Sequence, residues 1–153
     1  MMFKIFANVA ILLATIACAA PTTRDDAIHP ANKLVLRDSE NYCGNSSFTG
    51  QTTGGSPSVS DCQQIATNIA GGGVWTLTDG SQHQLLQYGS CAFGATQTSF
   101  TGIVQIGNQD IIDLIDSSVQ YSWNDLISME GDMSCAVEAG MVTNVNWGLY
   151  YNN

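Results

Sequence analysis

The sequence predicts an α+β fold: a small disulfide-stapled two-layer sandwich in which two helices cover an antiparallel sheet. Two segments carry apolar residues at helical spacing, residues 57–70 and 109–120. Strand-like segments stand between and after them in the mixed order helix, three strands, helix, two strands, which favours an antiparallel sheet. Of the five cysteines, the four after residue 42 make an even number, typical of a small secreted domain.

The N-terminal stretch predicts export from the cell. Lys4 precedes an apolar run over residues 9–16, and Ala17-Cys18-Ala19 supplies the small residues of a signal-peptide cleavage site. A membrane span needs about 20 apolar residues, so this run is too short for one. We expect a signal peptide over residues 1–19 and a secreted, extracellular protein with no membrane span.

The rest of the chain is predicted to be a leader followed by one domain. Residues 20–42 are polar, contain two prolines and show no sustained apolar periodicity, so we expect a disordered leader. Residues 43–153 have the length and apolar content of a single modest domain, which we expect to be monomeric.

The cysteines predict two disulfides. Removal of the signal takes away Cys18 and leaves Cys43, Cys62, Cys91 and Cys135, for which three pairings exist. We prefer Cys43 with Cys135, joining the two ends of the domain, and Cys62 with Cys91, joining a helix to a strand. The other two pairings stay open. The four cysteines are widely spaced in the sequence, with no C-x-x-C motif and no histidine cluster nearby, which disfavours a metal site. No cofactor is expected.

Charge narrows the class of partner. All four basic residues lie in the first 37 positions, and the segment from Cys43 to Asn153 contains nine acidic residues and no Lys or Arg. Its formal charge is therefore −9, which repels nucleic acid and anionic membranes. We expect no nucleic-acid partner, and stability from apolar burial, backbone hydrogen bonds and disulfides rather than from salt bridges.

The first helix and the following strands are marked by local signals. Ser56 and Pro57 are a capping serine and a first-turn proline, and three glycines from Gly71 end the helix predicted over residues 57–70. Residues 74–77 read as a strand, Asp79-Gly80 as a turn and residues 84–95 as a second strand region, which together predict a hairpin.

The second half of the domain continues the pattern. A short strand is predicted over residues 102–107, after which Asn108 is expected to cap the helix over 109–120. Residues 133–137 and 145–149 are predicted strands, and the alternation in the latter places Val145, Trp147 and Leu149 on one face.

Candidates for catalysis are few. His83, the single histidine of the domain, stands beside a predicted turn and is expected to be an exposed polar residue. The recurrence of Asp110, Asp113 and Asp116 at every third position is explained by a solvated helix face. No Gly-x-Ser-x-Gly motif is present, and the four domain cysteines are expected to be oxidised. We therefore expect no catalytic residues and no enzymatic activity.

Binding and modification candidates are more specific. Trp123 is the surface tryptophan expected to be free for binding, because Trp75 and Trp147 stand in strands among apolar neighbours. Asn45-Ser46-Ser47 is an acceptor motif for N-linked sugar, so Asn45 is a predicted glycosylation site. A calcium site built from the acids after residue 124 is disfavoured because no twelve-residue loop pattern is present.

Taken together, these segments resemble the necrosis-inducing-factor (extracellular protein two) effector domain of fungi. The resemblance covers essentially the whole domain and all four cysteines; it is carried by residues 43–48, 56–62, 72–75, 89–93, 107–111 and 131–135, and by Trp147-Gly148. It implies a secreted fungal virulence factor that acts on a plant host in the apoplast, in some relatives by provoking cell death, with no established enzymatic activity. It also implies a fold similar to that of fungal killer toxins.

Three functions follow from these readings. The first is a non-enzymatic effector that binds a host plant protein or cell-surface component. The second is a killer-toxin-like antimicrobial, which the absence of Lys and Arg in the domain disfavours. The third is a chitin- or carbohydrate-binding module that uses Trp123 with Tyr150 and Tyr151.

Overall fold

The computed structural model describes residues 39–98, 102–137 and 140–153. The predicted signal peptide and most of the predicted leader lie outside these residues. The described elements are, in chain order, β1 (Cys43–Ser46), β2 (Thr49–Gly50), α1 (Val59–Ile69), β3 (Val74–Leu77), β4 (His83–Tyr88), β5 (Cys91–Gln97), β6 (Val104–Gly107), α2 (Asn108–Val119), β7 (Met129–Ala136) and β8 (Val142–Tyr151).

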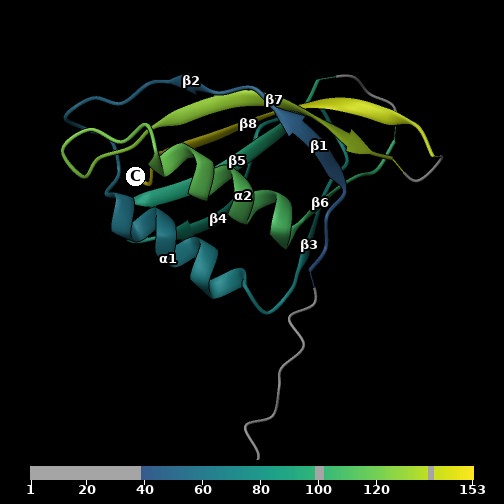
Figure 1. Cartoon of the computed structure of the whole chain (residues 1–153). Helices are drawn as coiled ribbons and strands as arrows, with labels where there is room; N and C mark the ends of the chain where they lie inside the picture. The colour runs from purple at the N-terminus through teal and green to yellow at the C-terminus, as the bar shows by residue number, and fades with distance from the viewer. Residues whose placement is uncertain (1–38, 99–101, 138–139) are drawn as a thin grey trace, which may run out of the picture. The chain divides into compact units, whose positions relative to one another are not determined.

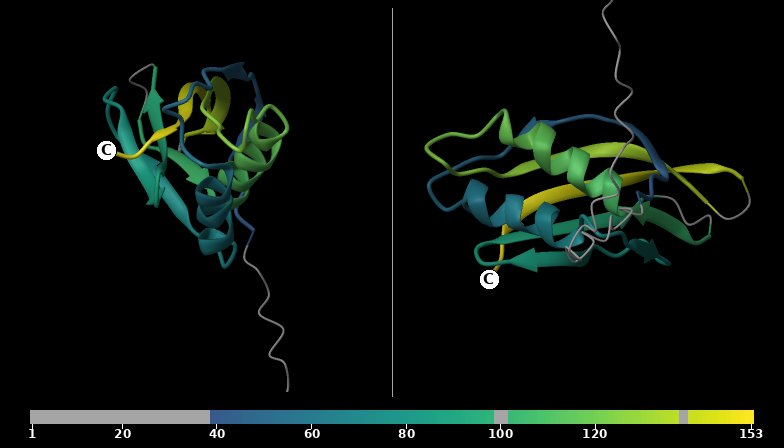
Figure 2. Two further views of the ribbon diagram at one scale, coloured as in Figure 1. Left: turned by 90° about the vertical axis from the view of Figure 1, so that its left-hand side faces the viewer. Right: turned by 60° about the horizontal axis from the view of Figure 1, so that its bottom comes forward.

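Antiparallel pairing organises the strands into two sheets. The main sheet has the order β1-β7-β8-β5-β4, with β2 also paired to β7, and β3 and β6 form a separate two-stranded sheet. Both helices lie on the same side of the main sheet (Figure 1) and run side by side across it (Figure 2). The α+β prediction of two helices on an antiparallel sheet is confirmed.

The core fills the space between the helices and the sheet. Ile65 of α1 and Ile111 and Ile115 of α2 pack in one apolar cluster with strand residues such as Phe93 and Leu149, all 2% exposed or less. Val145, Trp147 and Leu149 are buried on one face of β8, as their alternation predicts. Apolar burial of this kind, at about 25 cal/mol per Å², is the main favourable term in folding.

The start of α1 differs from the prediction. The N-cap is Ser58 rather than Ser56, and its hydroxyl accepts a hydrogen bond from the Asp61 N–H at 3.2 Å. Ser56 instead accepts from the Thr53 N–H at 2.8 Å, within the preceding turn. Two serines in one short segment can each cap a helix, and the turn around Ser56 decides between them.

The start of α2 differs as well. The N-cap is Gly107, and Asn108 is the first helical residue rather than the cap. The Asn108 side chain is buried, where it accepts from the Glu40 N–H at 2.9 Å and donates to the Ile69 carbonyl at 3.1 Å. Asn108 therefore joins α2 to the end of α1 and to the chain before β1.

The predicted hairpin of residues 74–77 with 84–95 is wrong. β3 pairs with β6, from Val74 opposite Gly107 to Leu77 opposite Val104. The second strand region is itself a hairpin, β4 with β5, whose turn at Gly89 has a positive φ of 51°. Glycine tolerates this φ without a steric penalty, so the chain reverses there.

The ordered domain also begins earlier than predicted. Glu40 lies against the start of α2, where its carbonyl accepts from the Gln109 N–H at 3.0 Å. The N–H groups of Tyr42 and Cys43 donate to the Asp110 carboxylate at 2.9 and 3.1 Å. Residues 39–42, assigned from sequence to the disordered leader, are therefore part of the folded structure.

Candidate functional site

The four domain cysteines form two disulfides, one between two strands of the main sheet and one between the helix layer and that sheet. Cys43–Cys135 joins β1 to β7, with Cα atoms 4.0 Å apart, and Cys62–Cys91 joins α1 to β5, with Cα atoms 5.2 Å apart. This is the pairing preferred from the sequence. Cys62, Cys91 and Cys135 are fully buried, so the disulfides belong to the core.

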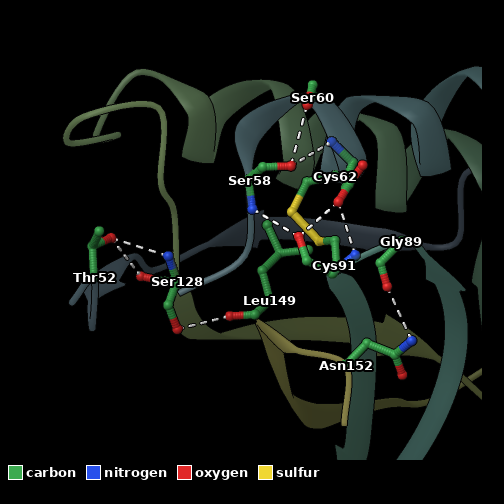
Figure 3. Close-up of a disulfide and its surroundings, with 11 residues drawn as sticks. Thr52, Ser58, Ser60, Cys62, Gly89, Cys91, Ser128, Leu149 and Asn152 are labelled. Carbon is green, nitrogen blue, oxygen red and sulfur yellow. Dashed lines mark hydrogen bonds between the residues drawn. A yellow bond between two sulfur atoms is a disulfide. The ribbon is translucent and has the colours of Figure 1, made fainter. Parts of the chain in front are cut away.

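A polar latch lies beside the second disulfide. Figure 3 shows Cys62 and Cys91 bonded beneath Ser58 at the start of α1. The Asp61 carboxylate accepts from the N–H and the hydroxyl of Ser90 at 2.8 and 2.7 Å, and the Ser90 hydroxyl accepts from the Ser58 N–H at 2.9 Å. These bonds, first that from the Ser90 N–H, hold the pKa of Asp61 below its usual value. The latch fixes the β4–β5 turn to the helix.

The predicted acidic face of α2 divides into two kinds of residue. Asp113 and Asp116 are exposed, as expected. Asp110 is only 6% exposed, because its carboxylate accepts from the N–H groups of Gly107, Tyr42 and Cys43. The regular spacing suggested a solvated face for all three, whereas Asp110 serves as a structural acceptor at the helix N-terminus.

His83 lies at the start of β4 and is partly exposed. Its Nε2 lies 2.8 Å from Asp79 Oδ1, and the two side chains are 40% and 48% exposed. The Ser81 N–H, and after it His83, hold the pKa of Asp79 below its usual value. This pair closes the Asp79–Gly80 turn, which agrees with the sequence reading of a histidine beside a turn.

The surface candidates from the sequence are separated in space. Trp123, 59% exposed, lies in the segment between α2 and β7, near Tyr121, which is 63% exposed. Phe48 stacks on Tyr121 with ring centroids 6.4 Å apart. Asn45 is exposed in β1, and Tyr150 and Tyr151 are adjacent in β8 and so point to opposite faces of the sheet.

A trough crosses the face of the main sheet that the helices leave uncovered. We call it the outer-face trough; its volume is about 410 Å³. One row of paired residues passes through it: Glu130 of β7, Gly148 of β8 and Gly94 of β5 line the trough, and Gln84 of β4 continues the row beyond it. Two glycines side by side make the floor low, and polar side chains rise around it from Gln51, Gln82, Thr96, Glu130 and Asn146.

The Tyr150 ring lies over this floor. A Cβ atom added to Gly94 would come within 2.6 Å of the Tyr150 hydroxyl and 2.9 Å of its ring, and one added to Gly148 within 3.7 Å of the ring. The ring therefore spans both glycines and covers Gly94, which is buried. Burial raises the pKa of the Tyr150 hydroxyl, and a hydrogen bond with the Gln82 side chain opposes the shift.

The sequence predicted only part of the trough. Tyr150 was a candidate for sugar binding, but Gly94, Gly148 and Asn146 were missed. The available signal was the alternation of small or polar residues with apolar ones along two strands, Ala92, Gly94 and Thr96 in β5 and Asn146, Gly148 and Tyr150 in β8. Recognising it required knowing that these strands are neighbours.

Within residues 39–98, 102–137 and 140–153, no three His, Cys, Asp or Glu residues are grouped closely enough to hold a metal ion. Over the same residues, neither helix has the length and apolar character that crossing a membrane requires.

Comparison with known proteins places the fold in a family. The Hce2 model, described as pathogen effector and necrosis-inducing factor, matches residues 42–135. The chain belongs to the Hce2 effector family. The matched residues contain both disulfides, both helices and the β4–β5 hairpin. The latch beside the second disulfide therefore also lies within the Hce2 region.

Two Penicillium expansum proteins contain a related segment. The chain is 38% identical over 112 residues to "Probable chitinase LysM18", which covers 71% of this chain and 8% of that protein. It is 34% identical over 102 residues to "Secreted chitinase LysM12", which covers 61% of this chain and 7% of that protein. The chain thus spans less than a tenth of the length of these relatives.

Proposed function

We propose that this protein is a secreted fungal effector that acts on a plant host in the apoplast by binding a host target, without catalysis. The observation that carries the proposal is the Hce2 effector match over residues 42–135, which includes all four domain cysteines. Host cell death is the expected consequence in plants that carry the matching target.

The two disulfides agree with export of the protein from the cell. Disulfides form and persist in oxidising compartments, and this domain has two of them, one within the main sheet and one between α1 and β5. We propose that residues 1–19 direct secretion and that Asn45, exposed in β1, carries an N-linked sugar. Intact mass of the protein from fungal culture medium, before and after enzymatic removal of N-linked sugar, measures both the N-terminus and the occupancy of Asn45.

The effector proposal is tested in plants. The purified secreted protein is infiltrated into leaves of several host genotypes, and the gene is deleted from the fungus that carries it. We expect local cell death in at least one genotype, or reduced infection by the deletion strain. No leaf response in any genotype together with unchanged infection would overturn the proposal.

A second candidate function is carbohydrate binding, with chitin as the first ligand to test. Two observations favour it: the relatives named as chitinases contain this module, and the outer-face trough combines an aromatic ring with amide side chains. Such a lining suits small polar ligands. Retention of the protein on chitin beads supports this function, and recovery of all protein in the supernatant rules out chitin as its ligand.

A further inference from the structure

The outer-face trough has the lining of a ligand site rather than of a packed surface. Gly94, Gly148 and Tyr150 form its floor, and the amides of Gln51, Gln82 and Asn146 stand around it. We propose that this trough binds a neutral oligosaccharide whose chain crosses the strands, with one sugar ring stacked on Tyr150. The proposal rests on carbohydrate binding, the second candidate function, and it assigns that function to a site.

The floor explains why a sugar ring fits there. Tyr150 lies across the backbone of the two glycines, with the ring edge formed by Cδ1, Cε1 and the hydroxyl nearest to them, and the partly exposed side chain lines the trough. The C–H groups on one face of a pyranose are apolar and weakly positive, and they complement the negative face of an aromatic ring. Any larger residue at position 94 would displace the Tyr150 ring from this position.

The polar lining suits hydroxyl and acetamido groups. Gln and Asn side chains each offer donors and an acceptor, so Gln51, Gln82 and Asn146 can pair with either partner of a sugar hydroxyl. Gln51 already donates to the Glu130 carboxylate at 2.8 Å, which fixes both side chains at one end of the trough. The Tyr150 hydroxyl, in contact with Gln82, supplies a neutral donor near the other end.

Charge selects a neutral ligand over an anionic one. The domain from Cys43 to Asn153 has no Lys or Arg, and Glu130 stands in the wall of the trough. A carboxylate, sulfate or phosphate on the ligand would meet negative charge without a cation to pair with, which costs binding energy. We therefore expect no binding of pectic or nucleic-acid ligands at this site.

The dimensions suit a short linear chain. A volume of about 410 Å³ lies within the usual range of small-molecule sites. The lining runs from Glu130 of β7 across β8 to Gly94 of β5, and two strand spacings amount to roughly 10 Å. The trough is therefore long enough for a short run of linked sugar units.

The test measures binding of defined hexasaccharides to the purified secreted protein by isothermal titration calorimetry. One arm uses N-acetylglucosamine hexasaccharide, a second uses β-linked glucose hexasaccharide, and a third uses the anionic galacturonate hexasaccharide. We expect binding of at least one neutral hexasaccharide and none of the anionic one. The neutral arm that binds more tightly identifies whether the source is a chitin-like or a glucan chain.

Variants locate the site. Tyr150→Ala removes the stacking ring, Gly94→Ala displaces it, and Asn146→Ala removes an exposed amide; we expect at least a tenfold loss of affinity for the first two and a smaller loss for the third. Tyr151→Ala is the matched control, since it removes the neighbouring tyrosine on the opposite side of β8, and Trp123→Ala tests the exposed tryptophan. Both should bind within twofold of wild type, and thermal unfolding checks that every variant is folded.

Two outcomes overturn the proposal in distinguishable ways. If wild type binds a neutral hexasaccharide and the Tyr150, Gly94 and Asn146 variants bind as wild type does, the trough is not the site although the protein binds carbohydrate. If neither neutral hexasaccharide binds, or the galacturonate arm alone binds, the trough proposal is wrong. Neither result alters the leaf assay, which tests the effector proposal separately.

Discussion

The two faces of the main sheet are built from the same strands but present different kinds of residue. On the face toward the helices, β5 and β8 present Phe93, Trp147 and Leu149, each 3% exposed or less. On the outer face, the alternate positions hold Gly94 and Gly148, residues that no core would use to fill space. Because side chains alternate along a strand, one face can be fixed by packing while the other is free to be shaped for a ligand.

Truncating a large residue on the inner face should have the largest effect on stability. Phe93→Ala opens a cavity beneath the helices, and we expect the free energy of unfolding to fall by about 3–5 kcal/mol. Tyr150→Ala on the outer face should lower it by about 1 kcal/mol or less. Chemical denaturation of both variants measures the comparison, and equal losses would show that the outer face also carries the fold.

Removing the α1–β5 disulfide should have the next largest effect on stability. Replacing both Cys62 and Cys91 by Ala frees a loop of 29 residues in the unfolded chain, for which loop entropy predicts a loss of about 3–4 kcal/mol. Because this bridge ties a helix to the inner face, amide exchange should rise first in α1. Exchange that rises equally in α1 and in β7 would contradict a local role.

A smaller effect is expected at the close contact between α2 and the chain before β1. A Cβ atom at Gly107 would lie 2.0 Å from the Glu40 carbonyl oxygen, so Gly107→Ala must displace residues 39–42 or the helix end. We expect the free energy of unfolding to fall by about 1–3 kcal/mol and the Tyr42 amide to exchange faster. Gly44→Ala is the control, since its nearest neighbour would be an ordinary 3.7 Å away.

The smallest expected effect on stability is that of lowering the pH. The pKa values of Asp61 and Asp79 are lowered in the folded state, so their contribution to stability is present above the unfolded pKa, about 4, and is lost as pH falls through the folded values. We expect these two groups to leave stability flat from pH 7 to about 5 and to lower it below about 4.

Two variants separate the Asp61 latch from other acidic groups. Asp61→Asn should be less stable than wild type at pH 7, with the difference shrinking at low pH. Ser90→Ala keeps the N–H donor to Asp61 and loses both the hydroxyl donor and the acceptor of the Ser58 N–H, so it should also be less stable than wild type, with a difference that depends less on pH than that of Asp61→Asn. Denaturation at several pH values measures this, and a difference between Asp61→Asn and wild type that does not change with pH would argue against the latch.

The sequence predicted what depends on local pattern. Both helices were placed within two residues at each end, because apolar spacing and glycine termination are local signals. The two caps were misassigned, since Ser58 and Ser56 are equally suited to capping and Asn108 is drawn into the core by Ile69 and Glu40. β1 and β2 were missed because they are short and polar and exist by pairing with β7.

What depends on distant pairing was not predictable. β3 and β4 are adjacent in sequence, yet β3 pairs with β6, and the pattern of neither strand specifies that partner. The outer-face trough has the same cause, because Gly94 and Gly148 become neighbours only when β5 pairs with β8. Of the trough residues, Tyr150 alone could be chosen from sequence, as an aromatic residue able to stack on sugar; the glycines beneath it could not.

The most direct test is to map the ligand contact on the ¹⁵N-labelled protein by amide chemical shifts during titration with the tighter-binding neutral hexasaccharide. If the outer face is the functional one, the largest shifts fall on Gly94, Asn146, Gly148 and Tyr150, while the amides of α1 and α2 change little. Shifts centred on Trp123, or on the helices, would contradict the division between a face that holds the fold and a face that binds.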